Sequence, residues 1–437
     1  MILGHGVGTR GDLPLPLWQF AWAAAAALVI SFVALGALWS RPKLAAAAEG
    51  RPVGAVATPV RVVAGVAQAV SFALFVLVVA AALFGVDSPN ANLAPVTIYV
   101  VVWIGLAVAS ALFGDVWRVL SPFETIGAGV ESLQRRLGRP VGQPDLASTT
   151  LGQWPAAAGI FAFLILELVH PAGDSPRILG IGLVLYTATM VFGVWHWGRG
   201  WLRDGEGFGV LFSLFAALSP LHVDDGRVRL RAPLSGLTGV TVKTGTLAVI
   251  LVTLGGTTFD GFAESEAWRD LVGRPDRWTG AFYLLVGLVV SIEVVGMLYA
   301  VGVRSVAAIT ATDHRDTARW FAPSLVPIVF GYAVAHYAQL LIDEVQSFAF
   351  RLSDPFGEGW DLFGTADGSI DFTVISPDVV AWIQALAIVV GHVAAVVVAH
   401  DTAVARFESR DATTSQYTML FVMVLYSIAG LWLLLEA

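Results

Sequence analysis

Four polar residues recur on one face of an apolar segment. Tyr332, His336, Gln339 and Asp343 are spaced i, i+4, i+7 and i+11 within the run from Phe321 to Ile342. At 3.6 residues per turn, this spacing places them along one side of a helix that is long enough to cross a bilayer. Titratable groups at that depth are costly, and they commonly mark ion, proton or substrate pathways. The spacing therefore predicts a polar site inside the membrane.

Two further ionisable residues are predicted at similar depth and complete this candidate pathway. Glu293 has Gly296 and Ala300 on its face at i+3 and i+7, and small residues favour close packing against another helix. Glu293 is either a proton acceptor or a neutral acid hydrogen-bonded between helices. His392 lies near the middle of a later apolar run. We expect both residues to lie close to His336.

Ionisable residues near the ends of the predicted spans form a secondary group of candidates: Glu167, His170, His196 and His400. Glu167 and His170 form an E-x-x-H pair, a spacing that builds di-iron sites when two helices carry it. The pair occurs once here and is followed by Pro171. Capping of a helix end or an ion pair is therefore favoured over a di-metal centre.

Three chemistries fit these side chains. His336, His392 and Glu293 could ligate a metal ion, because imidazole and carboxylate groups bind Zn, Cu, Fe or Ni. The same groups could form a proton or substrate pathway, or a structural polar network. Two facing histidines could also ligate haem. No cofactor is required by the sequence, so the three alternatives stay open.

Several enzyme classes are excluded or disfavoured. The chain has no cysteine, which excludes thiolate nucleophiles, disulfides and iron-sulfur clusters. It also contains no nucleotide-binding P-loop, nucleophile elbow or H-E-x-x-H motif. ATP-driven transport by this chain alone is disfavoured. The sequence leaves the question of an enzyme open and favours a protein that is not one.

The composition is that of an integral membrane protein. Hydrophobic residues make up 57% of the 437 residues, charged residues 13%, and the mean hydropathy is +0.75, whereas soluble domains contain about 25% charged residues. A net charge of -8 disfavours nucleic-acid binding, and the scarcity of lysine among acidic loops is typical of halophilic proteins. The first 14 residues lack the features of a cleavable signal peptide. We expect a multi-pass protein of the cell membrane.

The apolar runs predict an all-α transmembrane bundle of about ten helices, forming a single domain over residues 1–437. The ten runs are Trp18 to Trp39, Val63 to Phe84, Leu93 to Phe113, Trp154 to Val169, Ile178 to Gly198, Val240 to Thr258, Gly280 to Val303, Phe321 to Ile342, Val379 to His400 and Tyr417 to Leu435. The fourth run is short, and the sixth carries Lys243 near its start. Both are retained because together they sort the Lys and Arg residues into alternate loops, which predicts an N-out, C-out topology.

Three connecting regions carry further predictions. Residues 344–378 form an acidic outside loop, which is either a solvated surface or an ion-collecting vestibule. The similar segments GDVWRVL (Gly114 to Leu120) and GEGFGVL (Gly205 to Leu211) suggest a weak parallel repeat of residues 60–125 and 154–220. Phe208 to Leu218 is too short to span and predicts an interfacial or re-entrant helix. The segment GDVWRVLSPFETI predicts either a second short helix that Trp117 anchors at the interface, or a cytoplasmic gate that includes Asp115, Arg118 and Glu124.

Three segments resemble a known family. HGVGTRGDLPLPLW (His5 to Trp18), SDPFGEGWDLFGT (Ser353 to Thr365) and GHVAAVVVAHD (Gly391 to Asp401) are similar to stretches of a polytopic membrane protein family of actinobacteria and haloarchaea. Its members often carry the automatic label "fenitrothion hydrolase". That label implies a phosphotriester hydrolase, but the resemblance supplies no catalytic set to carry over to this sequence.

Together these features favour a transporter or channel-like protein that moves a small ion or solute through a His and acid site in the membrane. The alternative is a membrane metalloenzyme or a redox or haem subunit, which includes the hydrolase of the family label. A third alternative is a structural subunit of a membrane assembly. The expected partners are the lipid bilayer, a small ion or solute, and either further copies of the chain or a membrane complex.

Overall fold

The computed structural model describes residues 17–55, 58–142, 151–224 and 226–436. Within these ranges, nine helical segments are long and apolar enough to cross a membrane. They comprise α1 (Leu17–Leu38), α3 (Thr58–Phe84), α4 with η1 and α5 (Leu93–Pro95, Val96–Gly105, Leu106–Phe113), α10 (Pro176–Trp197), α13 (Thr246–Ala263), α15 (Arg277–Thr310), α17 (Val326–Ser353), α18 (Pro377–Arg406) and α20 (Tyr417–Glu436). The chain is therefore a multi-pass helical membrane protein, as predicted.

Shorter helices connect and fill this bundle. They are α2 (Leu44–Ala48), α6 (Trp117–Leu120), α7 (Pro122–Arg136), α9 (Trp154–Leu164), η2 (Ile165–Val169), η3 (Arg199–Trp201), α11 (Leu202–Gly205), α12 (Gly207–Ala216), η4 (Ser235–Gly239), α14 (Glu266–Val272), α16 (His314–Phe321), η5 (Ala322–Leu325) and α19 (Ser409–Thr414). The predicted fourth span corresponds to α9 with η2. It is helical but too short to be counted with the nine longer segments.

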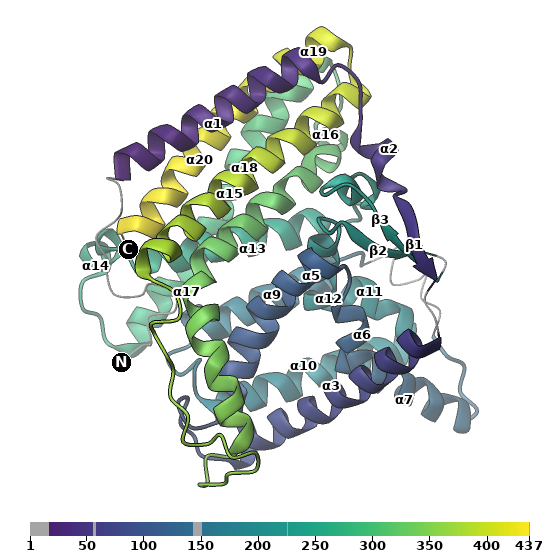
Figure 1. Ribbon diagram of the computed structural model, residues 1–437, viewed down its shortest axis with the longest axis vertical. Coiled ribbons are helices and arrows are strands. Elements are labelled where there is room, and N and C mark those ends of the chain that lie inside the picture. The colour runs from purple at the N-terminus through teal and green to yellow at the C-terminus, as the bar shows by residue number, and fades with distance from the viewer. Residues whose placement is uncertain (1–16, 56–57, 143–150, 225, 437) are drawn as a thin grey trace.

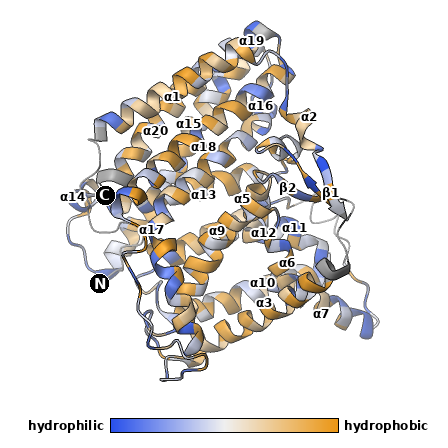
Figure 2. Ribbon diagram, viewed as in Figure 1, coloured by the Kyte–Doolittle hydropathy of each residue, from blue (hydrophilic) through white to orange (hydrophobic). Residues whose placement is uncertain are grey.

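A small antiparallel sheet was not predicted. Its strands are β1 (Arg51–Ala55), β2 (Leu221–Asp224) and β3 (Arg227–Leu230), in the order β1-β3-β2. Figure 1 shows the sheet beside α2, at the edge of the helical bundle, and α3 and α10 running side by side in another part of the molecule. Figure 2 shows hydrophobic residues along the long helices and hydrophilic residues in β1 and in many of the connections.

Two differences from the predicted boundaries affect the candidate site. α13 covers Thr246–Ala263 rather than Val240 to Thr258. It continues past Thr258 because Asp260 lowers the hydropathy of its last turn without ending the helix. α17 continues to Ser353, so the first ten residues of the predicted acidic loop are helical. The prediction about a signal peptide concerns the first 14 residues and lies outside the described part of the chain.

The short helix α12 lies inside the protein. Its residues Val210, Leu211, Phe212 and Phe215 are each at most 2% exposed, and the helix packs against α5, α9, α13 and α17. Short helices at membrane depth are tolerated when protein surrounds them. The surroundings of α12 therefore fit a re-entrant helix and not one that lies on the membrane surface.

Candidate functional site

The predicted polar stripe lies on α17, and its four members are not equally buried. Tyr332 and His336 are each only 1% exposed, whereas Gln339 and Asp343 are half-buried one and two turns further along. The side-chain amide of Gln339 donates a hydrogen bond to Asp343 Oδ2. The acidic partner of His336 comes instead from another helix.

That partner is Asp260, in the last turn of α13. His336 Nε2 lies 2.9 Å from Asp260 Oδ2, and the Tyr337 hydroxyl donates to the same oxygen at 2.7 Å. The three residues are at most 5% exposed. A buried carboxylate that shares one oxygen between an imidazole and a phenol is an arrangement able to accept and release a proton.

The contact between Asp260 and His336 forms because α13 and α17 approach each other closely. A Cβ atom at Gly261 would lie 2.7 Å from the Tyr332 hydroxyl oxygen, so a side chain there would require the neighbouring groups to move. The Tyr332 ring stacks on His336 with centroids 6.2 Å apart, and the Tyr337 ring meets His336 edge-on at 4.7 Å. The aromatic rings thus hold the imidazole in place beside Asp260.

Two more carboxyl groups lie near Asp260. Glu264, one turn beyond it, interacts electrostatically with both Asp260 and His336, and Glu167 of η2 interacts with Asp260. The Oε2 atoms of Glu264 and Glu167 are buried without a hydrogen-bond partner. Burial and the nearby charge of Asp260 raise the pKa of Glu264, just beyond the end of α13, from 4.5 to about 7. Among the described residues, no Lys or Arg forms an ion pair with any of these three acids.

Unusual helical geometry accompanies these acids. Glu167 lies in η2, a single-turn π-helix, and the ten-residue π-helix η1 packs directly against α17. π-helical segments inside longer helices are frequent at functional sites. The two π-helices η1 and η2 therefore distinguish the surroundings of Asp260 from the regular α-helices elsewhere in the bundle.

A buried polar stripe on α13 leads away from Asp260. Thr246, Thr253, Thr257 and Asp260 are spaced i, i+7, i+11 and i+14, so they share one helix face. Each is at most 5% exposed. Fourteen residues of α-helix correspond to about 21 Å, which is a large part of the thickness of the hydrocarbon core.

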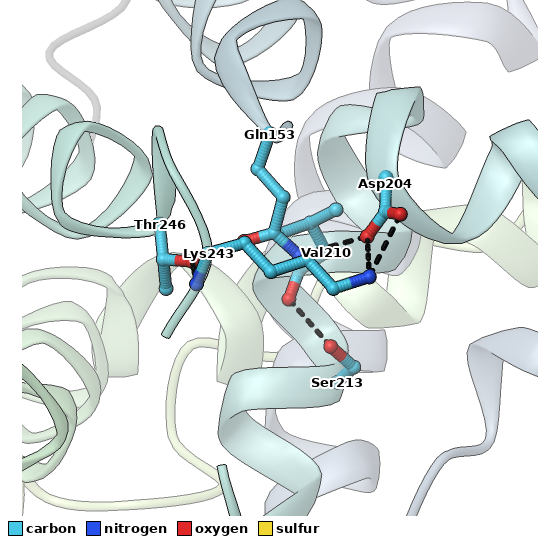
Figure 3. A network of polar contacts seen from close by, with 6 residues as sticks. All are labelled: Gln153, Asp204, Val210, Ser213, Lys243 and Thr246. Atoms are coloured by element: carbon cyan, nitrogen blue, oxygen red, sulfur yellow. Dashed lines mark hydrogen bonds and ion pairs between the residues drawn. The ribbon is translucent and has the colours of Figure 1, made fainter. Parts of the chain in front are cut away.

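A second polar network surrounds Thr246, at the other end of the stripe, and Figure 3 shows its side chains. Lys243 Nζ is 2.8 Å from both carboxylate oxygens of Asp204, and the Thr246 hydroxyl donates to Gln153 Oε1 at 2.6 Å. The Gln153 amide completes the link to Asp204 at 3.4 Å. In the same view, the Ser213 hydroxyl bonds the Val210 carbonyl inside α12. α13 therefore joins two polar networks, one at each end.

Apolar side chains separate the two networks. Trp103, Phe215 and Phe330 line a small cavity of about 10 Å³ beside Thr253, which is space for about one water molecule. The hydroxyls of Thr253 and Thr257 bond to carbonyls of their own helix. The stripe is thus occluded at mid-height in this conformation.

A third polar cluster surrounds Glu206, at the N-terminus of α12. Its carboxylate accepts from the Trp117 indole at 2.8 Å, the Tyr186 hydroxyl at 2.5 Å and the backbone N–H groups of Phe208 and Gly209 at 3.0 and 2.6 Å. Trp117 is buried, so the prediction that it anchors an interfacial helix is wrong. The two similar segments GDVWRVL and GEGFGVL meet at this indole, although their contact does not test a repeat.

His392 has different neighbours from His336. Its Nδ1–H donates to the Ile388 carbonyl within α18 at 2.9 Å, and its buried Nε2 has no partner. The ring lies 6.0 Å from that of Tyr426, whose hydroxyl is 2.5 Å from Thr258 Oγ1 on α13. Among the described residues, no hydrogen bond or ring contact joins the two histidines.

Glu293 does not join the cluster. It lies on α15 with its side chain exposed on the outer surface of the bundle, so the expectation that it lies close to His336 is wrong. The side of α15 that packs against α13 instead carries Ser291 and Ile292, which contact Gly255. Glu293 therefore points away from the polar interior.

The secondary candidates have local roles. His170 Nδ1 accepts from the Ala172 N–H just beyond the end of η2. His196 is exposed and stacks on Phe192 at 4.1 Å. His400 contacts the Trp39 carbonyl and Gln416, beside the α1–α2 connection. Of this group, only Glu167 lies at the Asp260 cluster.

The described residues contain no group of three or more His, Asp or Glu side chains arranged to hold a metal ion. His336, His392 and Glu293 in particular do not converge. The acids that do converge on His336 were missed in the sequence because the predicted sixth span ended at Thr258. The spacing of Thr246, Thr253, Thr257 and Asp260 was the signal that could have identified Asp260.

Comparisons of the chain with protein-family models, curated proteins and solved structures gave no significant match. The function must therefore be argued from the geometry of the polar networks.

Proposed function

We propose that this protein is a membrane transport protein in which Asp260, His336 and Tyr337 bind and release the proton that crosses the bilayer. Glu264 and Glu167 extend this proton site. The single observation that supports the proposal is the buried stripe on α13, which joins the Asp260 cluster to the Asp204–Lys243 network about 21 Å away. Intramembrane carboxylates and histidines in series are typical of proton relays.

The proton binds at a carboxylate in this scheme. Asp260 Oδ2 takes up the proton as its contact with His336 Nε2 opens, and Glu264 exchanges protons with the solvent at the nearer membrane face. With the predicted N-out topology, that face is the outer one. Asp204 and Lys243 then form the inner end of the route.

The occluded middle of the stripe requires a conformational change. Trp103, Phe215 and Phe330 block the route beside Thr253, so protons or water pass only when these rings separate. An apolar block between two polar networks is what alternating access needs, because it prevents a continuous leak. The proposal thus favours a carrier over an open channel.

Proton movement into reconstituted vesicles tests the proposal. The protein is placed in liposomes containing a pH-sensitive dye, and a pH gradient is imposed with valinomycin and potassium to balance charge. We expect flux above that of protein-free vesicles, and we expect Asp260→Asn to reduce it by about 100-fold. The control is Asp316→Asn, an exposed position on α16, which should leave the flux unchanged.

Two outcomes would contradict the proposal. Wild-type vesicles could be no more permeable to protons than protein-free vesicles, or Asp260→Asn could retain the full flux. Thermal unfolding of each variant, followed by tryptophan fluorescence, shows whether a loss of flux reflects a loss of fold.

A further inference from the structure

The exposed position of Glu293 has no explanation within one copy of the chain. α15 contains 34 residues, with Glu293 at its middle, and this corresponds to a helix about 51 Å long. Only 17% of its most apolar window is buried inside the chain. Glu293 therefore faces the surroundings of the bundle near the centre of the bilayer.

A carboxylate at that position is costly. An acidic side chain at the centre of a membrane helix costs about 2.5 to 3.5 kcal/mol on insertion scales, and such residues almost always face protein or water. No hydrogen bond or ion pair was found for the Glu293 carboxylate within the described chain. Something outside this copy must therefore cover it.

The residues around Glu293 form a regular stripe. Tyr283, Val286, Val290, Glu293 and Met297 are separated by 3, 4, 3 and 4 residues, and the four apolar members are 38%, 44%, 53% and 58% exposed. This alternation is the spacing of the contact residues in left-handed helix pairs, which are the commonest packing between membrane helices. A single polar residue within such a seam fixes register and partner number.

We propose that a second copy of this chain covers the stripe, with the two α15 helices packed across a two-fold axis normal to the membrane. Both copies insert in the same orientation, so residues at equal depth meet across that axis. Glu293 then faces the partner's Glu293. In its neutral form a carboxyl group donates one hydrogen bond and accepts another. The two Glu293 carboxyl groups can therefore hydrogen-bond to each other and need no other polar partner.

Single-cysteine crosslinking tests the interface directly, because the natural chain has no cysteine. Val290→Cys and Met297→Cys flank Glu293 on the stripe, and Val76→Cys on α3, at 50% exposure, is a matched control. Oxidation with copper phenanthroline in membrane vesicles should produce disulfide-linked dimers at the first two positions only. Equal crosslinking at Val76→Cys, or none at either stripe position, would overturn the proposal.

The role of the carboxyl pair is tested by counting molecules. Fluorescently labelled protein in dilute liposomes should bleach in two steps, and Glu293→Leu should weaken dimerisation at least tenfold. Glu293→Gln should retain the dimer, because an amide also donates and accepts. A wild-type monomer, or a Glu293→Leu dimer of unchanged affinity, would show the proposal to be wrong. Capture of a different membrane protein at Met297→Cys would equally overturn it in favour of another partner.

Discussion

Two buried carboxylates, Glu206 and Asp260, have opposite surroundings. Glu206 accepts four hydrogen bonds, two on each oxygen, at 2.5 to 3.0 Å. Both donors to Asp260, His336 and Tyr337, use the single oxygen Oδ2. Two further acids with unpartnered oxygens lie beside Asp260, whereas the partners of Glu206 are all donors.

The difference separates an acid that fixes the structure from an acid that is free to react. Four donors hold the Glu206 carboxyl group in one position at the N-terminus of α12, so this side chain holds the short helix in place. At Asp260, two neighbouring acids interact with the carboxylate, and only two donors among the described residues contact it. Buried acids at membrane depth thus fall into two classes, and the number of donors around each acid distinguishes them.

The largest loss of stability is expected for Glu206→Ala. The substitution leaves Trp117 Nε1, the Tyr186 hydroxyl and two backbone N–H groups without their acceptor, and each such loss costs about 1 to 3 kcal/mol. We expect a decrease in unfolding free energy of about 4 kcal/mol or more, measured by tryptophan fluorescence in detergent. Glu358→Ala, at an exposed position, is the control. Equal midpoints for the two variants would mean that Glu206 does not hold α12.

The next largest effect is a pH dependence of stability from Glu264. Its pKa is about 7 in the folded protein and 4.5 without burial, so the folded state binds more protons between these values. The stabilisation that Glu264 contributes is therefore complete below about pH 4.5 and is lost as the pH rises through 7, by on the order of 3 kcal/mol. Glu264→Gln should flatten this slope in thermal unfolding curves. A slope unchanged by the substitution would assign the pH dependence to other groups.

A smaller effect is expected for Gly261→Ala, which tests the approach of α13 to α17. The new Cβ would lie 2.7 Å from the Tyr332 hydroxyl oxygen, and overpacking of this kind costs about 1 to 3 kcal/mol. Proton flux should fall as well, because Asp260 is displaced from His336. The double variant Gly261→Ala/Tyr332→Phe lacks the clashing oxygen, so it should recover most of the lost stability and most of the lost proton flux. If the double variant did not recover, the clash with the Tyr332 hydroxyl would not be the cause of the losses.

The membrane fold was predictable because long apolar runs determine it. Spans such as α10, α15 and α18 need only length and hydropathy to be recognised. The small sheet and the interior position of α12 were not predictable in the same way. Both depend on contacts between distant segments, such as Arg51 with Leu230 and Trp117 with Glu206.

The candidate site was predictable only in part. The stripe on α17 identified Tyr332 and His336 as buried groups, because helical periodicity is a local property. The partners of His336 depend on which helix packs beside α17, and periodicity does not carry that information. Asp260 was lost when the sixth span was ended too early, and Glu293 was included because depth along a helix does not reveal which way the helix faces.

The smallest effects distinguish two neighbouring tyrosines of α17. Tyr337→Phe removes one of the two donors to Asp260 and should cost about 1 kcal/mol of stability, with a severalfold loss of proton flux. Tyr332→Phe removes a buried hydroxyl that has no hydrogen-bond partner, so stability should stay the same or rise. Both rings pack against His336, but only the Tyr337 hydroxyl donates to the acid. Parallel flux and unfolding measurements check the pair. If the two variants had the same flux and the same stability, the hydrogen bond from Tyr337 to Asp260 would have no role in proton transfer. The contrast between Asp260 and Glu206 would then no longer hold.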